Sequence, residues 1–151
     1  MEQILYIAYG SNLNLSQMSL RCPGAKPLGP GELPGWRLAF RGAERGYYLT
    51  LLPEPGGAVP VGVWAVTPED VGRLDEYEGY PEFYYKTELD VEYLDRASGE
   101  KRSARALVYI MREGCGPGAP TGEYYRGCLE GFGSFGLDTA PLEAAYREAT
   151  A

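Results

Sequence analysis

The chain has 151 residues, of which 44 % are hydrophobic, 21 are Gly and 12 are Pro. This length buries one sizeable core, so we expect a single, turn-rich domain over residues 1–151. A formal net charge of −7 argues against nucleic acid or an anionic membrane as a partner, because both require a basic surface. No apolar run approaches the roughly 18 residues of a transmembrane helix, and no basic, apolar leader is present, so we expect a cytoplasmic protein.

The chain contains no histidine, which excludes Ser-His-Asp and Cys-His catalysis and histidine-ligated metals. Cys22, Cys115 and Cys128 form no Cys-x-x-Cys pair, so neither a zinc site nor a disulfide framework is expected. Acid–base chemistry near neutral pH must then use a carboxylate, lysine, tyrosine or cysteine whose pKa is shifted. We expect no metal and no organic cofactor.

The first predicted element is a buried strand at residues 3–9, which breaks off at Gly10, Ser11 and Asn12. Small, turn-forming residues after a strand have two readings. They form a plain turn, in which Asn12 or Asn14 caps the next helix, or they leave backbone N–H groups free for a ligand.

A helix is predicted next, at residues 14–21, with Leu15, Met18 and Cys22 on one side. The following part of the chain is rich in strands separated by Gly-rich and Pro-rich segments. We expect strands at 35–41, 47–52 and 61–67, with a loop at 53–60.

A second helix has a clear start at Thr67-Pro68-Glu69-Asp70, which supplies a capping hydroxyl, a first-turn proline and two acids, and it ends at Gly79. The remaining elements are strands at 83–94 and 104–111, a Gly/Pro-rich connector, and helices near 121–135 and 139–149. Strands outnumber helices and short turns join many neighbours. We therefore predict an α+β fold with a mixed, mainly antiparallel, barrel-like sheet and flanking helices.

The second helix carries one acid on its buried face. At about 100° per residue, Val71 and Leu74 mark that face and Glu78 continues it. Glu76 points to nearly the opposite side, and Asp75 lies at the edge. Desolvation and the negative end of the helix dipole both favour protonation of an inward carboxylate at a helix C-terminus. Glu78 is thus a candidate general base near pH 7.

Each of these signals has an ordinary explanation when taken alone. Acids near the end of an amphipathic helix are usually a solvated surface, and Gly-Ser-Asn after a strand is usually a turn with a cap. Their combination is more informative. The first strand ends on "AYGSNL" (8–13), and the later helix ends on "LDEYEG" (74–79).

In this order and at this spacing, the two motifs resemble the gamma-glutamylcyclotransferase family, including its gamma-glutamylamine-cyclotransferase-like relatives. The resemblance runs from about Leu5 to Leu137. The first motif alone is moderately specific, and the two together with the late segment are strongly specific. The supporting segments are "RCPGA", "GWRLAF", "VGVWAVTPEDVGRLDEYEGYPEFY" and "PTGEYYRGCLEGFGSFGL".

The resemblance implies a barrel-like sheet surrounded by helices and a reaction that uses no water. The α-amine of a gamma-glutamyl compound attacks its own γ-carbonyl and releases 5-oxoproline plus an amine or amino acid. The family's catalytic glutamate matches Glu78 and its late tyrosine matches Tyr124. Its substrate loop matches Tyr6, Ile7, Ala8, Tyr9, Gly10 and Ser11, with Asn12 adjoining. Tyr84 matches a further family tyrosine, which either lines the pocket or packs in the core.

The residues suit this reaction. The α-amine must lose a proton before it attacks, and its pKa of ~7.7–8.0 compares with ~4.3 for an ordinary Glu. Burial of Glu78 narrows that gap, and the proton that it gains can pass to the departing nitrogen. Free N–H groups of residues 9–12 suit an oxyanion, and Gly10 permits close approach of the backbone.

The leaving group and the oligomeric state, monomer or homodimer, stay open. Tyr85-Lys86 stands where many relatives have two arginines. The segment "EGYP" is more similar to the gamma-glutamylamine branch, whereas "YGSNL" is more similar to the gamma-glutamyl-amino-acid branch. Two alternatives remain on the same fold: a non-catalytic binding or regulatory module, and an enzyme that removes a gamma-glutamyl protecting group in a biosynthetic pathway.

Overall fold

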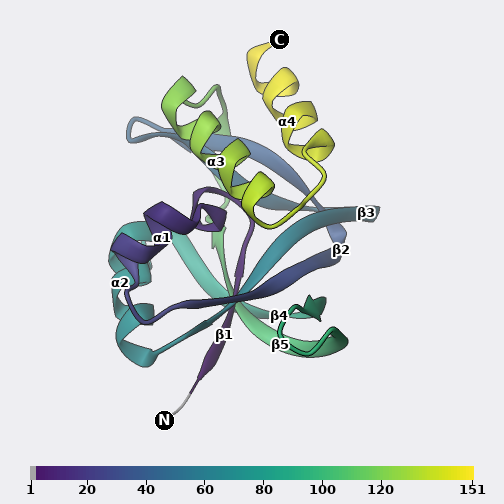
Figure 1. Ribbon diagram of the computed structural model, residues 1–151. Helices are drawn as coiled ribbons and strands as arrows, with labels where there is room; N and C mark the ends of the chain where they lie inside the picture. Colours follow the sequence, from purple (N-terminus) through teal and green to yellow (C-terminus); the bar gives the residue numbers. More distant parts are fainter. Residues whose placement is uncertain (1–2) are drawn as a thin grey trace.

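The computed structural model describes residues 3–151 (Figure 1). Helices and strands alternate irregularly along the chain, and most strands are joined to a neighbour by a short turn. In chain order the elements are β1 Ile4–Ala8, the 3-10 turn η1 Ser11–Leu13, α1 Leu15–Arg21, β2 Lys26–Ala43, β3 Gly46–Val66, α2 Pro68–Glu78, β4 Tyr84–Asp95, β5 Glu100–Met111, β6 Gly116–Pro117, α3 Gly122–Ser134 and α4 Ala140–Thr150.

The strands close into a barrel. The sheet runs β3-β1-β5-β4-β2, and β2 pairs back with β3, while the short β6 extends β2. Among the strands of residues 3–151, the β1–β5 pair is parallel and the other pairs are antiparallel. In Figure 1, α3 and α4 lie over one end of the strands, and α1 lies next to α2. The prediction of a mixed, mainly antiparallel, barrel-like sheet with flanking helices is confirmed.

The strands β2 and β3 are longer than predicted. The segment 53–60, predicted as a loop, belongs to β3, and 61–67 continues the same strand as far as Val66. Residues 53–60 pair with residues 32–36 of β2, with a register shift between Pro34 and Trp36, and the Pro/Gly-rich residues 26–31 of β2 pair with residues 61–65. Cross-strand pairing outweighs the low strand propensity of these residues, which are tolerated at irregularities of a ladder.

The helix predictions are confirmed to within a few residues at each end. The Thr67 side chain accepts from the Asp70 N–H in a capping box, and Gly79 ends α2 with a φ of 67°. Of the two candidate caps for α1, Asn14 fills the position, because its side chain accepts from the Gln17 N–H.

The predicted buried side of α1 is partly wrong. Met18 and Cys22 are buried as predicted, but Leu15 is 42 % exposed. The reason lies in the first turn, where the Asn14 amide donates to the Gly127 carbonyl of α3. This bond holds Asn14 against α3 and directs the next side chain, Leu15, toward solvent.

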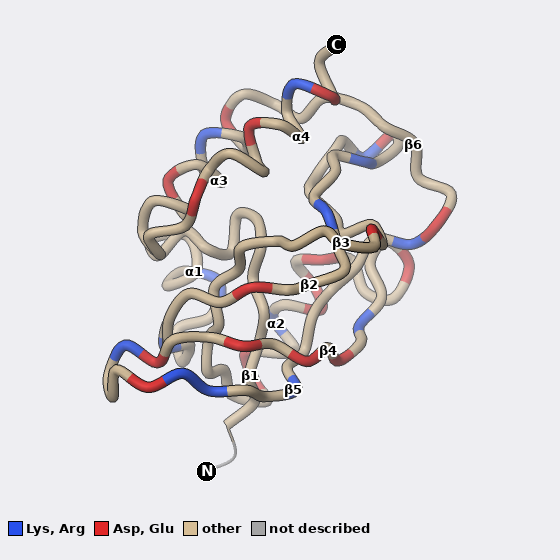
Figure 2. Tube along the Cα trace, turned by 90° about the vertical axis from the view of Figure 1, so that its right-hand side faces the viewer, with Lys and Arg blue, Asp and Glu red and all other residues tan. Residues whose placement is uncertain are grey.

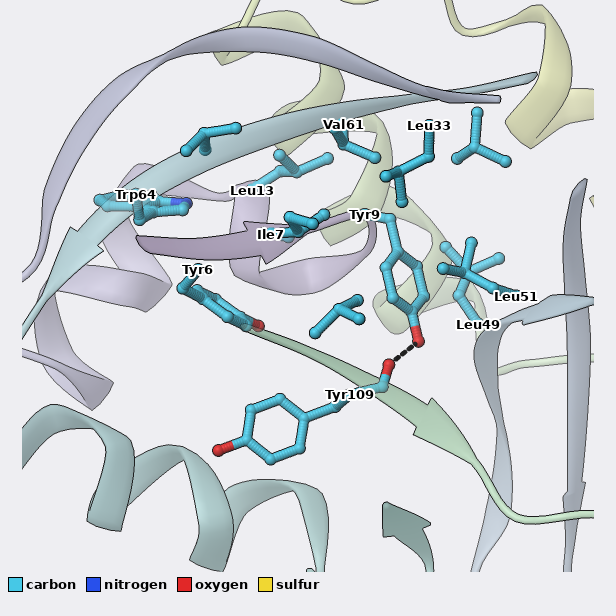
Figure 3. Packing of buried hydrophobic residues seen from close by; sticks show 14 of the residues in the cluster. Tyr6, Ile7, Tyr9, Leu13, Leu33, Leu49, Leu51, Val61, Trp64 and Tyr109 are labelled. Carbon is cyan, nitrogen blue, oxygen red and sulfur yellow. Dashed lines mark hydrogen bonds between the residues drawn. The ribbon is translucent and has the colours of Figure 1, made fainter. Parts of the chain in front are cut away.

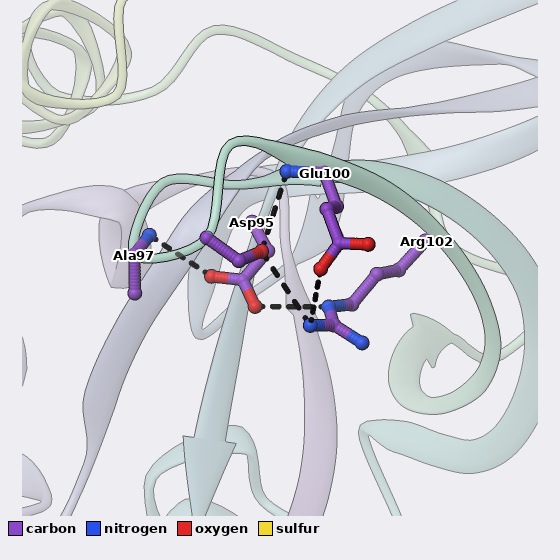
Figure 4. A network of polar contacts seen from close by, with 5 residues as sticks. Asp95, Ala97, Glu100 and Arg102 are labelled. Atoms are coloured by element: carbon purple, nitrogen blue, oxygen red, sulfur yellow. Dashed lines mark hydrogen bonds and ion pairs between the residues drawn. The ribbon is translucent and has the colours of Figure 1, made fainter.

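The turn between β4 and β5 is shorter than the segment between the predicted strands at 83–94 and 104–111, because β4 extends to Asp95 and β5 begins at Glu100. Asp95 accepts from the Ala97 N–H at 3.0 Å and from Arg102 Nε at 2.9 Å, as Figure 4 shows. The side chains of Ser98 and Glu100 also lie within reach of Arg102. Exposed ion pairs of this kind contribute about 1 kcal/mol or less, so the network shapes the turn more than it stabilises the fold.

The strand β1 runs through the middle of the core (Figure 3). Tyr6 packs edge-on against Tyr109 with ring centroids 6.0 Å apart, and the Tyr9 hydroxyl donates to the Tyr109 carbonyl at 2.6 Å. Ile7, which lies between Tyr6 and Tyr9 in the sequence, is fully buried. The core thus fixes β1 tightly up to the point where it ends at Ala8.

We predict that any side chain at Gly131 destabilises the fold, because α3 packs closely against the turn after β1 at this residue. A Cβ there would come within 2.7 Å of the backbone of Leu13 and Asn14. Gly131→Ala should therefore lower the free energy of unfolding in urea by about 1–3 kcal/mol.

Gly133 of the same helix is the matched control, because a Cβ there meets nothing within 4 Å. Gly133→Ala should leave stability unchanged or raise it by up to about 1 kcal/mol, as expected for Ala in a helix. Equal effects of the two changes would contradict the close contact at Gly131.

Candidate functional site

A cavity of about 160 Å³ opens where β1 ends and where α2 ends. All predicted site residues except Ile7 and Ala8 line it. From the N-terminal segment these are Tyr6, Tyr9, Gly10, Ser11 and Asn12, and from later elements Glu78, Tyr84 and Tyr124. Three segments that are far apart in the sequence therefore meet at one place.

Ile7 and Ala8, predicted as part of the substrate loop, lie in the barrel wall instead. They pair with Val63 and Gly62 of β3, and both are buried. Side chains alternate along a strand, so the strand that brings Tyr6 to the cavity turns Ile7 away from it. Ile7 and Ala8 hold β1 in register rather than facing the cavity.

The residues after β1 line the cavity, and the turn that they form does not use all of their backbone N–H groups. In η1 the Leu13 N–H donates to the Gly10 carbonyl, and the Asn14 N–H donates to the Ser11 carbonyl. This pattern leaves the N–H groups of Gly10, Ser11 and Asn12 outside the bonds of the turn, as at the start of any such turn. The Gly-Ser-Asn segment is therefore a turn, and it also has donors to offer.

Arg21 of α1 fixes the side chains of this turn. One guanidinium nitrogen donates to Asn12 Oδ1 at 2.5 Å and to Ser11 Oγ at 3.3 Å, and the other donates to Gln17 at 2.7 Å. The guanidinium also lies 3.8 Å from the ring centre of Tyr77. Arg21 thus joins the turn to α2 through a cation–π contact.

Another part of the cavity wall is formed by Tyr84 and Tyr124, whose hydroxyls both bind the backbone of Leu49. The Tyr84 hydroxyl donates to the Leu49 carbonyl at 2.7 Å, and the Tyr124 hydroxyl accepts from the Leu49 N–H at 3.2 Å. A Cβ at Gly10 would come to 3.2 Å from the same Tyr124 hydroxyl. A side chain at this position would force the Tyr124 hydroxyl to move by a few tenths of an ångström, so glycine suits the close approach of the loop to the wall.

Glu78 is the last residue of α2, and its partly exposed side chain faces the cavity. Among residues 3–151, no hydrogen bond or ion pair of its carboxylate is found. Burial raises the pKa of Glu78 from 4.5 to about 8, and the positive charge of Arg21 partly offsets this effect. Glu78 is thus a carboxylate that has no partner among the described residues, and its raised pKa lies close to neutral pH.

The other two acids of the motif are used differently. Asp75 accepts from the Tyr109 hydroxyl at 2.6 Å and from Lys86 Nζ at 3.1 Å, whereas Glu76 is exposed. Because the Tyr109 carbonyl also receives the Tyr9 hydroxyl, Tyr109 ties α2 to the end of β1. The helical-wheel prediction placed Asp75 at the edge and Glu76 outward, and the structure agrees.

Sequence reasoning missed several residues around the cavity. Arg21 lies in the "RCPGA" segment and Tyr77 in the "LDEYEG" motif, so both stood within recognised stretches. Phe83 lies in the quoted "EGYPEFY" segment as well, whereas Arg45 in the β2–β3 turn and Tyr48 and Leu49 on β3 have no pattern of their own. The missed lining residues are Arg45, Tyr48, Leu49, Tyr77 and Phe83.

Within the part of the chain that the structure describes, no three Cys, Asp or Glu side chains come together as metal ligands do. None of the described helices is both long enough and apolar enough to cross a bilayer.

Comparison with known proteins identifies the family. The family model described as "Gamma-glutamyl cyclotransferase, AIG2-like" matches residues 6–126. The human gamma-glutamylcyclotransferase is 32 % identical over 117 residues, or 73 % of this chain, and the mouse protein is 34 % identical over 123 residues, or 77 %. These matches span 60 % and 64 % of the relatives' own length, which is less than two thirds in both.

Solved structures support the same fold. A protein named gamma-glutamyl cyclotransferase superposes with a TM-score of 0.75 at 27 % identity, over 99 % of this chain and 88 % of that one. YkqA from Bacillus subtilis superposes with a TM-score of 0.79 over the whole of this chain and 55 % of its own, and at 21 % identity it shows the fold alone.

We predict that the Glu78 carboxylate destabilises the fold at high pH. Its pKa is about 8 in the folded chain against the ordinary 4.5, so between these pH values the folded state holds a proton that the unfolded state lacks. Stability from this group is complete below about pH 4.5 and is lost as the pH rises through 8. Relative to wild type, Glu78→Gln should gain roughly 3–5 kcal/mol between pH 4.5 and pH 9.

Urea denaturation of both proteins across this pH range measures the difference. Glu76→Gln is the control, because Glu76 is exposed, and it should follow wild type. A Glu78→Gln curve parallel to wild type would show that the Glu78 pKa is close to that of an ordinary carboxyl.

Proposed function

Because the chain belongs to the AIG2-like gamma-glutamyl cyclotransferase family, we propose that it is an enzyme that converts a gamma-glutamyl amino acid or amine to 5-oxoproline and the free amino acid or amine. The observation that carries this proposal is the Glu78 carboxylate, which has no partner among the described residues and lines the same cavity as Gly10, Ser11 and Asn12. A base and a set of oxyanion donors are the two elements that the cyclisation needs.

Glu78 acts first as a base. It takes a proton from the substrate α-ammonium, and a Glu pKa of about 8 is close to that of such an amine, ~7.7–8.0. The free amine attacks the γ-carbon of the same molecule, and a five-membered ring forms. Since the cavity holds the two ends of one molecule together, the attack gains from proximity.

Glu78 then acts as an acid. The tetrahedral intermediate collapses, the bond between the γ-carbon and the amide nitrogen breaks, and the proton held by Glu78 passes to that nitrogen. The products are 5-oxoproline and an amine, and no water is consumed. No enzyme nucleophile is required, which is consistent with a chain that has no histidine to activate one.

The turn after β1 stabilises the charge that develops on the γ-carbonyl oxygen. Backbone N–H groups of Gly10, Ser11 and Asn12 donate to this oxygen, and Arg21 keeps the turn in place through the Ser11 and Asn12 side chains. Donors that are fixed before the substrate arrives need no reorganisation during the reaction.

We propose that the enzyme is cytoplasmic and that it needs no cofactor. Cys22, Cys115 and Cys128 are free, as in a reducing compartment. The reaction needs no Lewis acid, and the substrate is the only partner that we infer. In the view of Figure 2, Lys and Arg are scattered among Asp and Glu along the chain, which does not favour nucleic acid.

We predict that Glu78→Gln removes turnover while the fold remains. The amide has nearly the same shape but cannot accept the proton, so the rate of 5-oxoproline release should fall by about 10²–10⁴. In the wild type, kcat/KM should rise with pH as Glu78 loses its proton near 8, and it should fall again at higher pH, where the substrate amine is already neutral and Glu78 has no proton to pass to the departing nitrogen.

Glu76→Gln is the control, and it should keep both the rate and the pH profile. A wild-type rate in Glu78→Gln would assign Glu78 a structural role. Release of 5-oxoproline from one unusual amide alone, in a panel of gamma-glutamyl amino acids and amines, would favour removal of a protecting group. No release from any compound would favour a binding module.

We predict that bulk at Gly10 is worse for catalysis than loss of the Ser11 hydroxyl. A Cβ at Gly10 would come to 3.2 Å from the Tyr124 hydroxyl and 3.4 Å from Leu49, both of which line the cavity, so the larger side chain of Val would crowd this part of the lining. Ser11→Ala removes one neutral hydrogen-bonding group, worth roughly 0.5–1.5 kcal/mol, or about two- to twelvefold in rate.

Melting temperature and cyclisation rate, measured on the same preparations, separate the two roles of the turn. A folded but inactive Gly10→Val beside a mildly impaired Ser11→Ala is the expected pair. Loss of stability in proportion to loss of activity in Gly10→Val would mean that the glycine only turns the chain.

A further inference from the structure

Arg45 is a positively charged residue that lines the cavity and has no role in the catalytic steps proposed above. It lies in the turn between β2 and β3, where Gly46 has a φ of 123°, and it lines the cavity while its side chain remains exposed. The hairpin therefore carries a positive charge to the mouth of the cavity.

The guanidinium has a defined place. Its carbon lies 4.9 Å from the ring centre of Phe83, and a Cβ on Gly79 would come within 2.9 Å of its Nη1. Arg45 is thus held on an aromatic ring next to the residue that follows Glu78. Stacking of this kind orients the planar fork of an arginine before a ligand arrives.

The charge of Arg45 is not neutralised by the protein. None of the ion pairs of residues 3–151 involves Arg45. This holds although Glu44 directly precedes Arg45 in the sequence and Glu82 directly precedes Phe83. Arg21 differs, because its guanidinium already holds Ser11, Asn12 and Gln17. Of these two arginines, Arg45 is the one available to a ligand.

The geometry of the proposed reaction decides what reaches Arg45. The glutamyl part lies inside, with its amine at Glu78 and its γ-carbonyl at the turn after β1. The group on the far side of the amide bond then extends to the exposed mouth, where Phe83 and Arg45 lie. A carboxylate there would find a planar, unpaired guanidinium, the group best matched to it.

Resting on the proposed function, we propose that Arg45 is a specificity-determining residue that selects substrates whose departing group carries a carboxylate. The preferred substrates are then gamma-glutamyl amino acids, and gamma-glutamyl amines with an uncharged departing group are disfavoured. On this proposal the departing group is an amino acid rather than an uncharged amine.

A pair of substrates of equal shape tests this selection. Gamma-glutamyl-alanine and gamma-glutamyl-alaninamide differ only in the charge of the terminal group. Wild type should prefer the acid in kcat/KM, and Arg45→Gln should reduce the acid-to-amide ratio by about three- to tenfold, as for a charge-assisted bond at an exposed site. High salt should reduce the wild-type preference as well.

Arg105→Gln is the matched control, because Arg105 lies on β5 in exposed pairs with Glu88 and Asp90, and it should keep the ratio. Arg45→Lys should keep part of the preference. Equal loss of activity on both substrates in Arg45→Gln would overturn the proposal, since Arg45 would then hold the glutamyl carboxylate that the two share. An unchanged ratio would overturn it too.

Binding to Glu78→Gln, measured by calorimetry, separates this inference from the proposed reaction. The same acid-over-amide preference should appear in affinity and should disappear in Glu78→Gln/Arg45→Gln. A preference in binding without any wild-type turnover would refute the reaction and support the role of Arg45. Turnover of both substrates at equal efficiency would support the reaction and refute the role of Arg45.

Discussion

A half-buried carboxylate without a partner is the constraint on which the site depends. Such a group is unfavourable, and a fold tolerates it only where the surrounding structure is firmly held. The supports are visible on α2: a capping box at Thr67 begins the helix, Gly79 ends it, and Asp75 binds the Tyr109 hydroxyl one turn before Glu78. The neighbouring acid thus takes the structural bonds, and Glu78 is left free to exchange a proton.

Tyrosines suit the walls of this cavity because they remain neutral while Glu78 titrates. Burial first, and the Glu78 carboxylate second, raise the pKa of Tyr6 and Tyr9 well above 10. Their hydroxyls therefore stay as hydrogen-bonding groups at any pH at which Glu78 gains or loses its proton. The Tyr9 hydroxyl is committed to the Tyr109 carbonyl and that of Tyr6 accepts from Asn12. The walls position the loop, and the acid–base work is left to one residue.

The sequence was sufficient for whatever is encoded locally. Capping residues and helical periodicity predicted α2 and the inward direction of Glu78 correctly, and the two motifs led to the fold. It failed where distant segments decide: residues 53–60 form a strand because β2 pairs with them, and Leu15 is exposed because α3 holds Asn14. Arg45 was missed for the same reason, since only closure of the barrel brings the β2–β3 turn to the end of α2.

The central claim is that Glu78 carries a proton to near-neutral pH, and its own titration tests this most directly. In protein labelled with ¹³C at the glutamate side-chain carboxyl, the Glu78 signal is identified by its absence in Glu78→Gln and is followed by NMR from pH 4 to 10. We expect this one carboxyl to titrate with a pKa of about 8, well apart from the exposed glutamates. Titration of Glu78 together with the others, at the ~4.3 of an ordinary Glu, would contradict its role as the base.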